Sequence, residues 1–332
     1  MVTERPALRL ATRGSPLARW QAGRVGALLE QVGVAAVLVV VDTLGDRRTD
    51  VPLDRLGGQG VFVREVQAAV VRGQADVAVH SAKDLPAAPE LAVPGLVLAG
   101  FPERVDPRDV LVGGPLDRLP TGATIATGSA RRRVQLANHR PDLTFAGLRG
   151  NLATRLAVVG TGPVAAVVVA KAALDRLEWS PPHGVDAEVL SPTIVLPQVG
   201  QGALALECRA DDEGTRAVLA RLDDPHVGPL VTAERAFLAA LGGGCTLPVG
   251  ANASWSIAAP GSGGGPAEIT LTGMLASPDG VVVLRHTRTG TSPTELGRSA
   301  ARYLLDDAGG RGLGEWTPTI APGAAPGGPV AR

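Results

Sequence analysis

The first 200 residues alternate between short apolar runs and longer segments whose apolar positions follow a helical period. The apolar runs are rich in Val, Leu and Ala and predict β-strands at 7–12, 36–42, 75–80, 96–100, 123–127, 143–147 and 164–170. The helical patterns fall between many of them, at 16–31, 61–72, 129–138, 151–160 and 171–177. Alternation of apolar strands with helices is typical of α/β units with largely parallel sheets.

Three of the predicted helices begin with a capping signal. Ser15 in "LATRGSPLARW" precedes Pro16, a residue favoured at the first helical position. Ser129 occupies the same place in "IATGSARRRVQL", and Asn151 does so in "LRGNLATRL". The similarity of the first two stretches indicates two related α/β domains, the second beginning near residue 100.

The pattern changes after about residue 190 and indicates a smaller α+β domain. We expect a turn and an apolar strand over 196–209, a helix over 226–241, strands over 267–275 and 280–288, and a helix over 294–308. The loop 259–266 is rich in glycine, and the tail 315–332 is rich in Pro, Gly and Ala, so we expect that tail to be disordered.

The composition is that of an ordinary globular protein, with 45% hydrophobic and 19% charged residues. Aromatic residues make up only 3%, which argues against a nucleic-acid platform that stacks bases. The net charge is zero, no apolar run is long enough to cross a membrane, and the N-terminus lacks the apolar region of a secretion signal. We therefore expect a cytoplasmic protein that binds neither membrane nor nucleic acid.

Cys245 stands on an unusually bare stretch, "LGGGCTLPVG", and the chain has one other cysteine, Cys208. Four roles are open to it: half of a disulfide, a metal ligand, a nucleophile or an attachment point. Two cysteines without an export signal weaken the disulfide. Five histidines without ligand spacing weaken the metal, so no metal is expected. We expect Cys208, which lies within an apolar strand, to be a small buried apolar residue.

Six arginines gather between residues 131 and 155, and the only acidic residue among them is Asp142. Several flank predicted helix N-termini, where backbone N–H groups and guanidinium groups both favour anions. Arg13, just before Ser15, repeats the arrangement in the first domain. The favoured interpretation is a site for a small polyanionic ligand. For single arginines such as Arg140, a place on a solvated helical face is an equal alternative.

A second polar cluster follows the predicted strand in "ADVAVHSAKDLP". Lys83 and Asp84 stand in the loop after the strand, a usual place for proton-transfer chemistry. Lys83 is one of only two lysines in the chain. An exposed surface pair is the alternative. The charged, glycine-containing stretch 42–65 predicts a mobile loop with the possible role of a lid.

These stretches, taken in order, resemble the hydroxymethylbilane synthases, also called porphobilinogen deaminases. The resemblance covers roughly residues 9–250 and rests on "RLATRGSPLARWQA", "GGQGVFVRE", "ADVAVHSAKDLP", "DPRDVLV", "ATGSARRRVQLA", "RPDL", "LRGNLATRL", "LPQVGQGALALECR", "VTAERAFL" and "GGGCTLPVG". It implies a transferase that joins four porphobilinogens head to tail with loss of ammonia, and water then releases a linear hydroxymethyl tetrapyrrole.

The resemblance also implies a dipyrromethane cofactor, held by a thioether to Cys245, and a catalytic carboxylate, Asp84. Asp84 would contact the pyrrole nitrogens and stabilise the cationic azafulvene. The residues matching cofactor-binding positions are Lys83, Asp84, Ser129, Arg131 and Arg132. Those matching substrate-binding positions are Arg13, Ser15, Gln21, Ser81, Thr127, Arg149, Arg155 and Arg176. Each pyrrole of the substrate carries two carboxylates, in agreement with the arginine-rich loops.

The fold implied by the resemblance has two α/β domains like those of periplasmic binding proteins, with the active cleft between them, and a small C-terminal α+β domain. The expected boundaries are 1–99 with 196–219 for the first domain, 100–195 for the second, 220–314 for the third and 315–332 for the tail. The family leads us to expect a monomer.

Some positions depart from the pattern of the family. Arg55 and Gln59 stand where many members have lysines, Gly242 replaces a common glutamate and Ala82 a common methionine. These departures concern the contacts of the lid and not the expected reaction. A non-catalytic two-lobed protein that binds a small polyanion is the alternative function, and the mass of the purified chain would separate the two.

Overall fold

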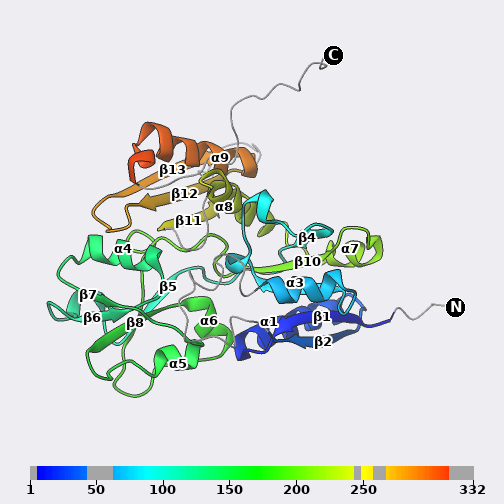
Figure 1. Ribbon diagram of the computed structural model, residues 1–332, viewed down its shortest axis with the longest axis horizontal. Helices are drawn as coiled ribbons and strands as arrows, with labels where there is room; N and C mark the ends of the chain where they lie inside the picture. The colour runs from blue at the N-terminus through cyan, green and yellow to red at the C-terminus, as the bar shows by residue number, and fades with distance from the viewer. Residues whose placement is uncertain (1–5, 43–62, 243–247, 257–266, 314–332) are drawn as a thin grey trace, which may run out of the picture.

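Three β-sheets organise the chain in the computed structural model, which describes residues 6–42, 63–242, 248–256 and 267–313. Figure 1 shows them as three groups of elements, each sheet with its own helices. Two sheets have five strands and belong to α/β units, and the third has three strands. Two α/β units followed by a small α+β unit are the predicted fold class, which is thus confirmed.

The first sheet has the order β2-β1-β3-β10-β4. Its strands are β1 (Leu8–Arg13), β2 (Ala36–Val41), β3 (Val77–Ser81), β4 (Leu96–Gly100) and β10 (Leu204–Arg209). The first three in that order are parallel and β10 is antiparallel to both of its neighbours. Because side chains alternate along a strand, Leu10 packs on α1 (Pro16–Gln31) and Ala11 packs on α3 (Arg64–Val71) on the opposite face.

The second sheet repeats this plan in the order β7-β6-β8-β5-β9. Its strands are β5 (Asp109–Val112), β6 (Thr124–Ala126), β7 (Thr144–Ala146), β8 (Val164–Ala170) and β9 (Ala187–Val189). Here β5 is the antiparallel fourth strand. Its helices are α4 (Ala130–His139), α5 (Leu152–Leu156) and α6 (Lys171–Arg176). Leu136 of α4 packs on one face of the sheet, and Leu174 of α6 packs with Val167 of the other.

The chain crosses between the two sheets twice, from β4 to β5 and from β9 back to β10. The crossing segments bond to each other: Val105 N–H donates to Gly202 O at 3.1 Å and Leu204 N–H donates to Glu103 O at 2.9 Å. Gly202 has φ +87°, and a Cβ there would lie 2.4 Å from Val105 O. Glycine is therefore required where the two segments meet.

The third sheet is antiparallel and consists of β11 (Val249–Trp255), β12 (Ile269–Ala276) and β13 (Val283–Gly290). Two helices, α8 (Gly228–Ala240) and α9 (Pro293–Arg302), share a core with it. A separate cluster joins Met274 of β12 to Val134 of α4 and to Leu196. The third unit thus packs against the helix that carries the arginine run.

The structure confirms each predicted strand and helix within a few residues at either end. The prediction omitted the short strands β5 and β9, the strand β11 and helix α7 (Glu213–Leu219). The expected helix 151–160 ends at Leu156, and the chain then turns through Gly160, which has φ +71°. The capping predictions for Ser15, Ser129 and Asn151 are confirmed.

Some expectations fall on residues outside those that the structure describes. They concern most of the proposed lid loop, the glycine-rich loop 259–266 and the tail 315–332. The domain boundaries stay a prediction. Within the described residues, no helix combines the length and the apolar character that crossing a membrane requires.

Candidate functional site

A small pocket lies where β1 passes into α1, beside the end of β3. Its cavity has a volume of about 60 Å³, and its lining includes Arg13, Ser15, Gln21, Ser81 and Asp84. Gln21 Nε2 donates a hydrogen bond of 2.7 Å to Ser81 Oγ, which ties the helix to the end of the strand. The structure therefore brings together five of the predicted site residues, which come from two separate stretches of sequence.

Lys83 and Asp84 lie in η2 (Ala82–Asp84), a single turn of 3-10 helix that follows β3 directly. Both are half-buried, so the alternative of an exposed surface pair is wrong. Burial lowers the pKa of Lys83 to about 8 because it disfavours the charged ammonium, and the arginines of α4 lower it further, while Asp84 and Asp109 raise it. Lys83 Nζ also donates to Gln201 Oε1 at 3.3 Å.

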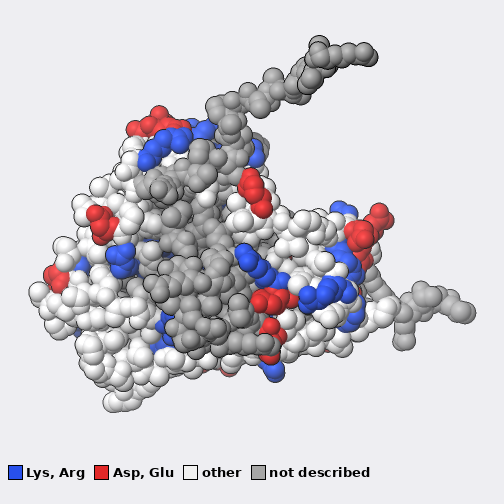
Figure 2. Space-filling view, in the orientation of Figure 1, with Lys and Arg blue, Asp and Glu red and all other residues white. Residues whose placement is uncertain are grey.

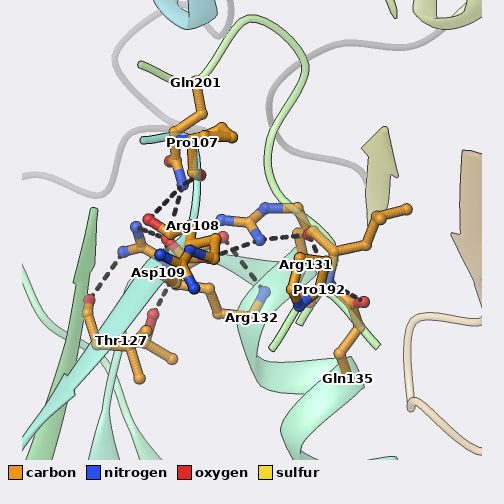
Figure 3. A network of polar contacts seen from close by, with 12 residues as sticks. Pro107, Arg108, Asp109, Thr127, Arg131, Arg132, Gln135, Pro192 and Gln201 are labelled. Atoms are coloured by element: carbon orange, nitrogen blue, oxygen red, sulfur yellow. Dashed lines mark hydrogen bonds and ion pairs between the residues drawn. The ribbon is translucent and has the colours of Figure 1, made fainter. Parts of the chain in front are cut away.

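Two arginines of α4, Arg131 and Arg132, converge on one carboxylate, that of Asp109 at the start of β5, as Figure 3 shows. Arg131 Nη1 donates to Oδ2 at 2.8 Å, and Arg132 donates to Oδ1 from Nη2 at 2.7 Å and from Nε at 3.2 Å. Asp109 is 0% exposed. Burial alone would raise the pKa of this carboxyl, but the two guanidinium groups outweigh that effect and hold it well below its usual range. Asp142 is the only acidic residue within 131–155, but the carboxylate that pairs with Arg131 and Arg132 is Asp109, from outside that stretch.

Backbone carbonyls fix the same two arginines from the other side. Arg131 Nη1 donates to Leu196 O at 2.7 Å, and Arg132 Nη1 donates to Val168 O at 2.8 Å. Ser129 caps the helix by accepting from the backbone N–H of Arg132. Arg131 Nε is buried and has no hydrogen-bond partner among the described residues. A buried N–H of this kind is a donor that an anionic ligand can satisfy.

Arg140 does not contact Asp109, and the interpretation of Arg140 as a solvated residue is wrong. Its guanidinium donates to Asp142 through Nε at 2.7 Å and Nη2 at 2.6 Å. It also donates to the carbonyls of Leu116 and Leu119 at 2.7 and 3.0 Å. Arg140 therefore has a structural role, joining the end of α4 to the loop before β6.

Arg149 and Arg155 lie on the next strand-to-helix connection of the second unit. Arg155 Nε donates to Gly150 O at 2.8 Å. The pKa of Arg155 is lowered overall, first by burial and then by the nearby charges of Arg132 and Arg149, and the charge of Asp84 partly offsets this lowering. Arg149 Nη1 is buried and lacks a partner among the described residues. Asp84, on the first unit, therefore lies within electrostatic range of Arg155 on the second.

Two further predicted site residues have partners of their own. Thr127 is buried, and its Oγ1 accepts from the N–H of Ser129 at 3.2 Å, so it shapes the start of α4. Arg176 lies where the two halves meet: Nη2 donates to Gly202 O at 2.8 Å and the guanidinium stands 5.7 Å from the ring centre of Trp20. Arg176 Nε is buried without a partner in the described part of the chain.

Of the two cysteines, only Cys208 lies within the described residues. Cys208 is buried in β10, and burial raises the pKa of its thiol to about 11, so it is an unreactive part of the core. Cys245 lies outside the described residues, as do Arg55 and Gln59. Among the described residues, no group of three or more His, Cys, Asp or Glu side chains could hold a metal.

Sequence reasoning missed several residues of this region. Asp109 and Gln201 complete the arginine network, and a charged residue opening the apolar stretch "DVLV" was the available signal for Asp109. His80, which lines the pocket, places Nε2 3.0 Å from Glu207 Oε2. Gln67 Nε2 donates to the same oxygen at 2.9 Å. Burial would raise the pKa of Glu207, but these partners outweigh it and the pKa is lowered.

Comparison with known families matches nearly the whole chain. The model described as porphobilinogen deaminase, dipyromethane cofactor binding domain, matches residues 8–217. The model described as porphobilinogen deaminase, C-terminal domain, matches residues 229–306. The first covers both α/β units, and the second covers most of the small α+β unit.

Curated relatives are similar over most of their own length. Porphobilinogen deaminase of Acidothermus cellulolyticus is 45% identical over 307 residues, which cover 90% of this chain and 88% of that protein. The Brevibacillus brevis protein of the same name is 43% identical, with 92% and 96% covered, and that of Bacillus subtilis is 40% identical, with 90% and 93% covered.

Solved structures show a more distant similarity. The periplasmic VFT2 domain of BvgS from Bordetella pertussis is 19% identical, with a TM-score of 0.41 over 65% of this chain and 86% of that one. The GluR0 ligand-binding core in complex with L-glutamate is 12% identical, with a TM-score of 0.39 over 66% of this chain and 90% of that one.

Proposed function

This chain belongs to the porphobilinogen deaminase family, and from that premise we propose that it is a hydroxymethylbilane synthase. It joins four porphobilinogen molecules head to tail, releases ammonia at each addition, and frees a linear hydroxymethyl tetrapyrrole with water. The product leads into tetrapyrrole and haem biosynthesis. The reaction needs a carboxylate beside the reacting pyrrole and cations for the acetate and propionate groups.

One observation carries this proposal: a carboxylate of the first α/β unit acts electrostatically on an arginine of the second. Asp84 raises the pKa of Lys83 in its own turn and that of Arg155 across the junction. A binding protein for a polyanion would gain nothing from a carboxylate there, because it repels the ligand. An enzyme that creates a positive charge on its substrate gains a counter-charge at that point.

The buried donors of the site fit a dipyrromethane, whose side chains are carboxylates. Arg131 Nε and Arg149 Nη1 are buried and lack partners among the described residues, and a carboxylate oxygen would satisfy each of them. Lys83, Ser129 and Arg132 lie with Arg131 around the same junction and would hold the remaining oxygens. The thiol of Cys245 would hold the group through a thioether, and the group would supply the pyrrole carbon to which the first substrate is joined.

Asp84 is the catalytic residue in this proposal. Its carboxylate accepts the hydrogen bond of a substrate pyrrole N–H and stabilises the positive charge that develops as ammonia leaves. Because the turn η2 is half-buried, few water molecules compete for the same carboxylate, which strengthens the interaction. The same group can assist the proton transfer that restores the aromatic ring after each addition.

The other predicted residues bind the carboxylates of the incoming substrate. Arg13, Ser15, Gln21 and Ser81 do so from the pocket beside α1. Thr127, Arg149, Arg155 and Arg176 do so from the second unit. Arg176 reaches the backbone of the crossing segments, which supports a role at the junction of the two halves.

The domain boundaries given above are proposed as well, and the membership of the sheets supports them: β10, within 196–219, pairs with strands of the first unit. A cytoplasmic monomer that binds no nucleic acid and no membrane is proposed from the composition and the family. A non-catalytic two-lobed binding protein is not favoured, because the family match extends over the third unit.

Intact mass tests the proposal directly. Chain purified from cells that make porphobilinogen should carry the added mass of a dipyrromethane, and it should release ammonia and a linear tetrapyrrole from porphobilinogen. Chain of unmodified mass that gives neither product would contradict the proposed function, and binding of a polyanion without turnover would favour the alternative.

A further inference from the structure

The carboxylate of Asp109 accepts four hydrogen bonds in a fully buried position. Besides the three from Arg131 and Arg132, Gln201 Nε2 donates to Oδ1 at 2.8 Å. One negative charge thus lies between two guanidinium groups, of which Arg131 is 2% exposed. Without it, two like charges would face each other in a region of low dielectric constant, which is strongly unfavourable.

The two arginines share this carboxylate unequally. Arg132 gives it the paired Nε and Nη2 donors of one edge. Arg131 gives it Nη1 only, and that same nitrogen also reaches Leu196 O. The Nε of Arg131 is left without a partner among the described residues. The pair therefore holds a net positive charge, with one buried donor still to be satisfied.

Gln201 extends the network to the other half of the molecule. Its Nε2 donates to Asp109 Oδ1 and to Pro107 O, at 2.8 and 2.6 Å, and its Oε1 accepts from Lys83 Nζ at 3.3 Å. Pro107 and Gln201 belong to the two segments that cross between the sheets. Figure 3 shows Gln201 and Pro107 together on one side of Asp109, with Arg131 and Arg132 nearby. The carboxylate is thus linked both to α4 and to the turn that carries Asp84.

We propose that Asp109 is a positioning residue for cofactor assembly: it orients Arg131 and Arg132 so that the buried Nε of Arg131 is presented to a pyrrole carboxylate, and through Gln201 it fixes Lys83 against the same ligand. The proposal rests on the proposed function. Asparagine at this position would keep one acceptor, but its amide NH₂ would face the N–H groups of an arginine and no counter-charge would remain.

The test measures loading of apoprotein made in cells that lack porphobilinogen. Wild type, Asp109→Asn and Asp109→Glu are incubated with increasing porphobilinogen, and intact mass gives the fraction that carries a dipyrromethane. Thermal unfolding midpoints are measured in parallel, and every loading reaction is run well below the lowest midpoint. The glutamate variant keeps the charge but displaces it by one methylene group, so it covers the case in which the asparagine variant fails to fold.

The chain offers a matched control in Asp76, another carboxylate that contacts two arginines. Arg9 Nη2 donates to Asp76 Oδ1 at 2.8 Å, and Arg209 Nη2 lies 3.5 Å from the same oxygen. Asp76 precedes β3, whereas the candidate site follows that strand, so the two lie at opposite ends of it. Asp76→Asn therefore removes a similar ion pair far from the site.

We expect Asp109→Asn to need at least about tenfold more porphobilinogen than wild type for half-loading, the effect of one lost charge-assisted hydrogen bond. Asp109→Glu should show a smaller increase, and Asp76→Asn should load like wild type even where its unfolding midpoint falls. If a folded Asp109 variant loads at the wild-type concentration, or if Asp76→Asn shows the same loss, the positioning role is overturned. If wild type itself carries no adduct, the proposed function fails as well, which distinguishes the two failures.

Discussion

Replacing Lys83 by methionine should make the apoprotein more stable at neutral pH while it abolishes cofactor assembly. Burial lowers the pKa of Lys83 from its ordinary value of 10.5 to about 8. A shift of this size corresponds to a cost of about 3 kcal/mol for keeping the ammonium charged in the folded chain. Methionine is of similar length and carries no charge, so it avoids that cost but gives up the hydrogen bond to Gln201, worth about 1 kcal/mol. We expect a net gain of about 1–3 kcal/mol at pH 7.

The stability gained by Lys83→Met should depend on pH. Below pH 8, Lys83 is protonated in both the folded and the unfolded chain, and the folded state bears the whole cost of burial. Between pH 8 and 10.5 the folded chain releases the proton while the unfolded chain keeps it, so stability rises with pH. The advantage of Lys83→Met over wild type should therefore shrink by about 2 kcal/mol between about pH 7 and 9.5.

Urea unfolding of the apoproteins at the two pH values measures this difference, provided that the slopes of the transitions agree. Lys171→Met is the matched control, since Lys171 is the other lysine of the chain and pairs with Asp175 at the surface. An advantage of Lys83→Met that stays constant with pH, or that appears equally in the control, would refute the reasoning. So would a Lys83→Met chain that assembles the cofactor as well as wild type.

Three further predictions address the reaction, the attachment point and the arginines. Asp84→Asn should keep the fold and the covalent cofactor but lose at least about 10²-fold in single-turnover ammonia release, with Asp84→Glu retaining more; near-normal release would remove Asp84 from the mechanism. Cys245→Ser should give folded chain without an adduct and Cys208→Ser should keep one, and peptide mapping of the adduct to Cys208 would reverse the assignment. Arg131→Leu should block loading, whereas Arg140→Leu should lower the unfolding midpoint and leave loading unchanged; equal loading by both would count against the anion site.

The sequence was sufficient for features that depend on neighbouring residues. Ser15, Ser129 and Asn151 cap their helices because each cap is a contact with a backbone N–H three residues along the chain, and such contacts need no tertiary structure. The apolar runs likewise identified most strands, since strands covered on both faces are apolar throughout. The order of the motifs also sufficed for the family, and the match to the two family models confirms it.

Only the tertiary structure decided which charges meet. Asp109 is 22 residues from Arg131, and the strand order of the second sheet brings the two into contact. It is 92 residues from Gln201, which reaches it through the second crossing of the chain between the sheets. From the sequence, Arg131 was assigned to the cofactor only through the resemblance to the family, and Arg140 was left open as a solvated residue. One retains a buried Nε with no partner among the described residues, and the other is held by Asp142 and two carbonyls. Burial and the pairing of distant charges determine the pKa values and decide which buried N–H groups lack a partner. Burial and pairing follow from how the sheets are connected, and no local pattern of residues specifies that connection.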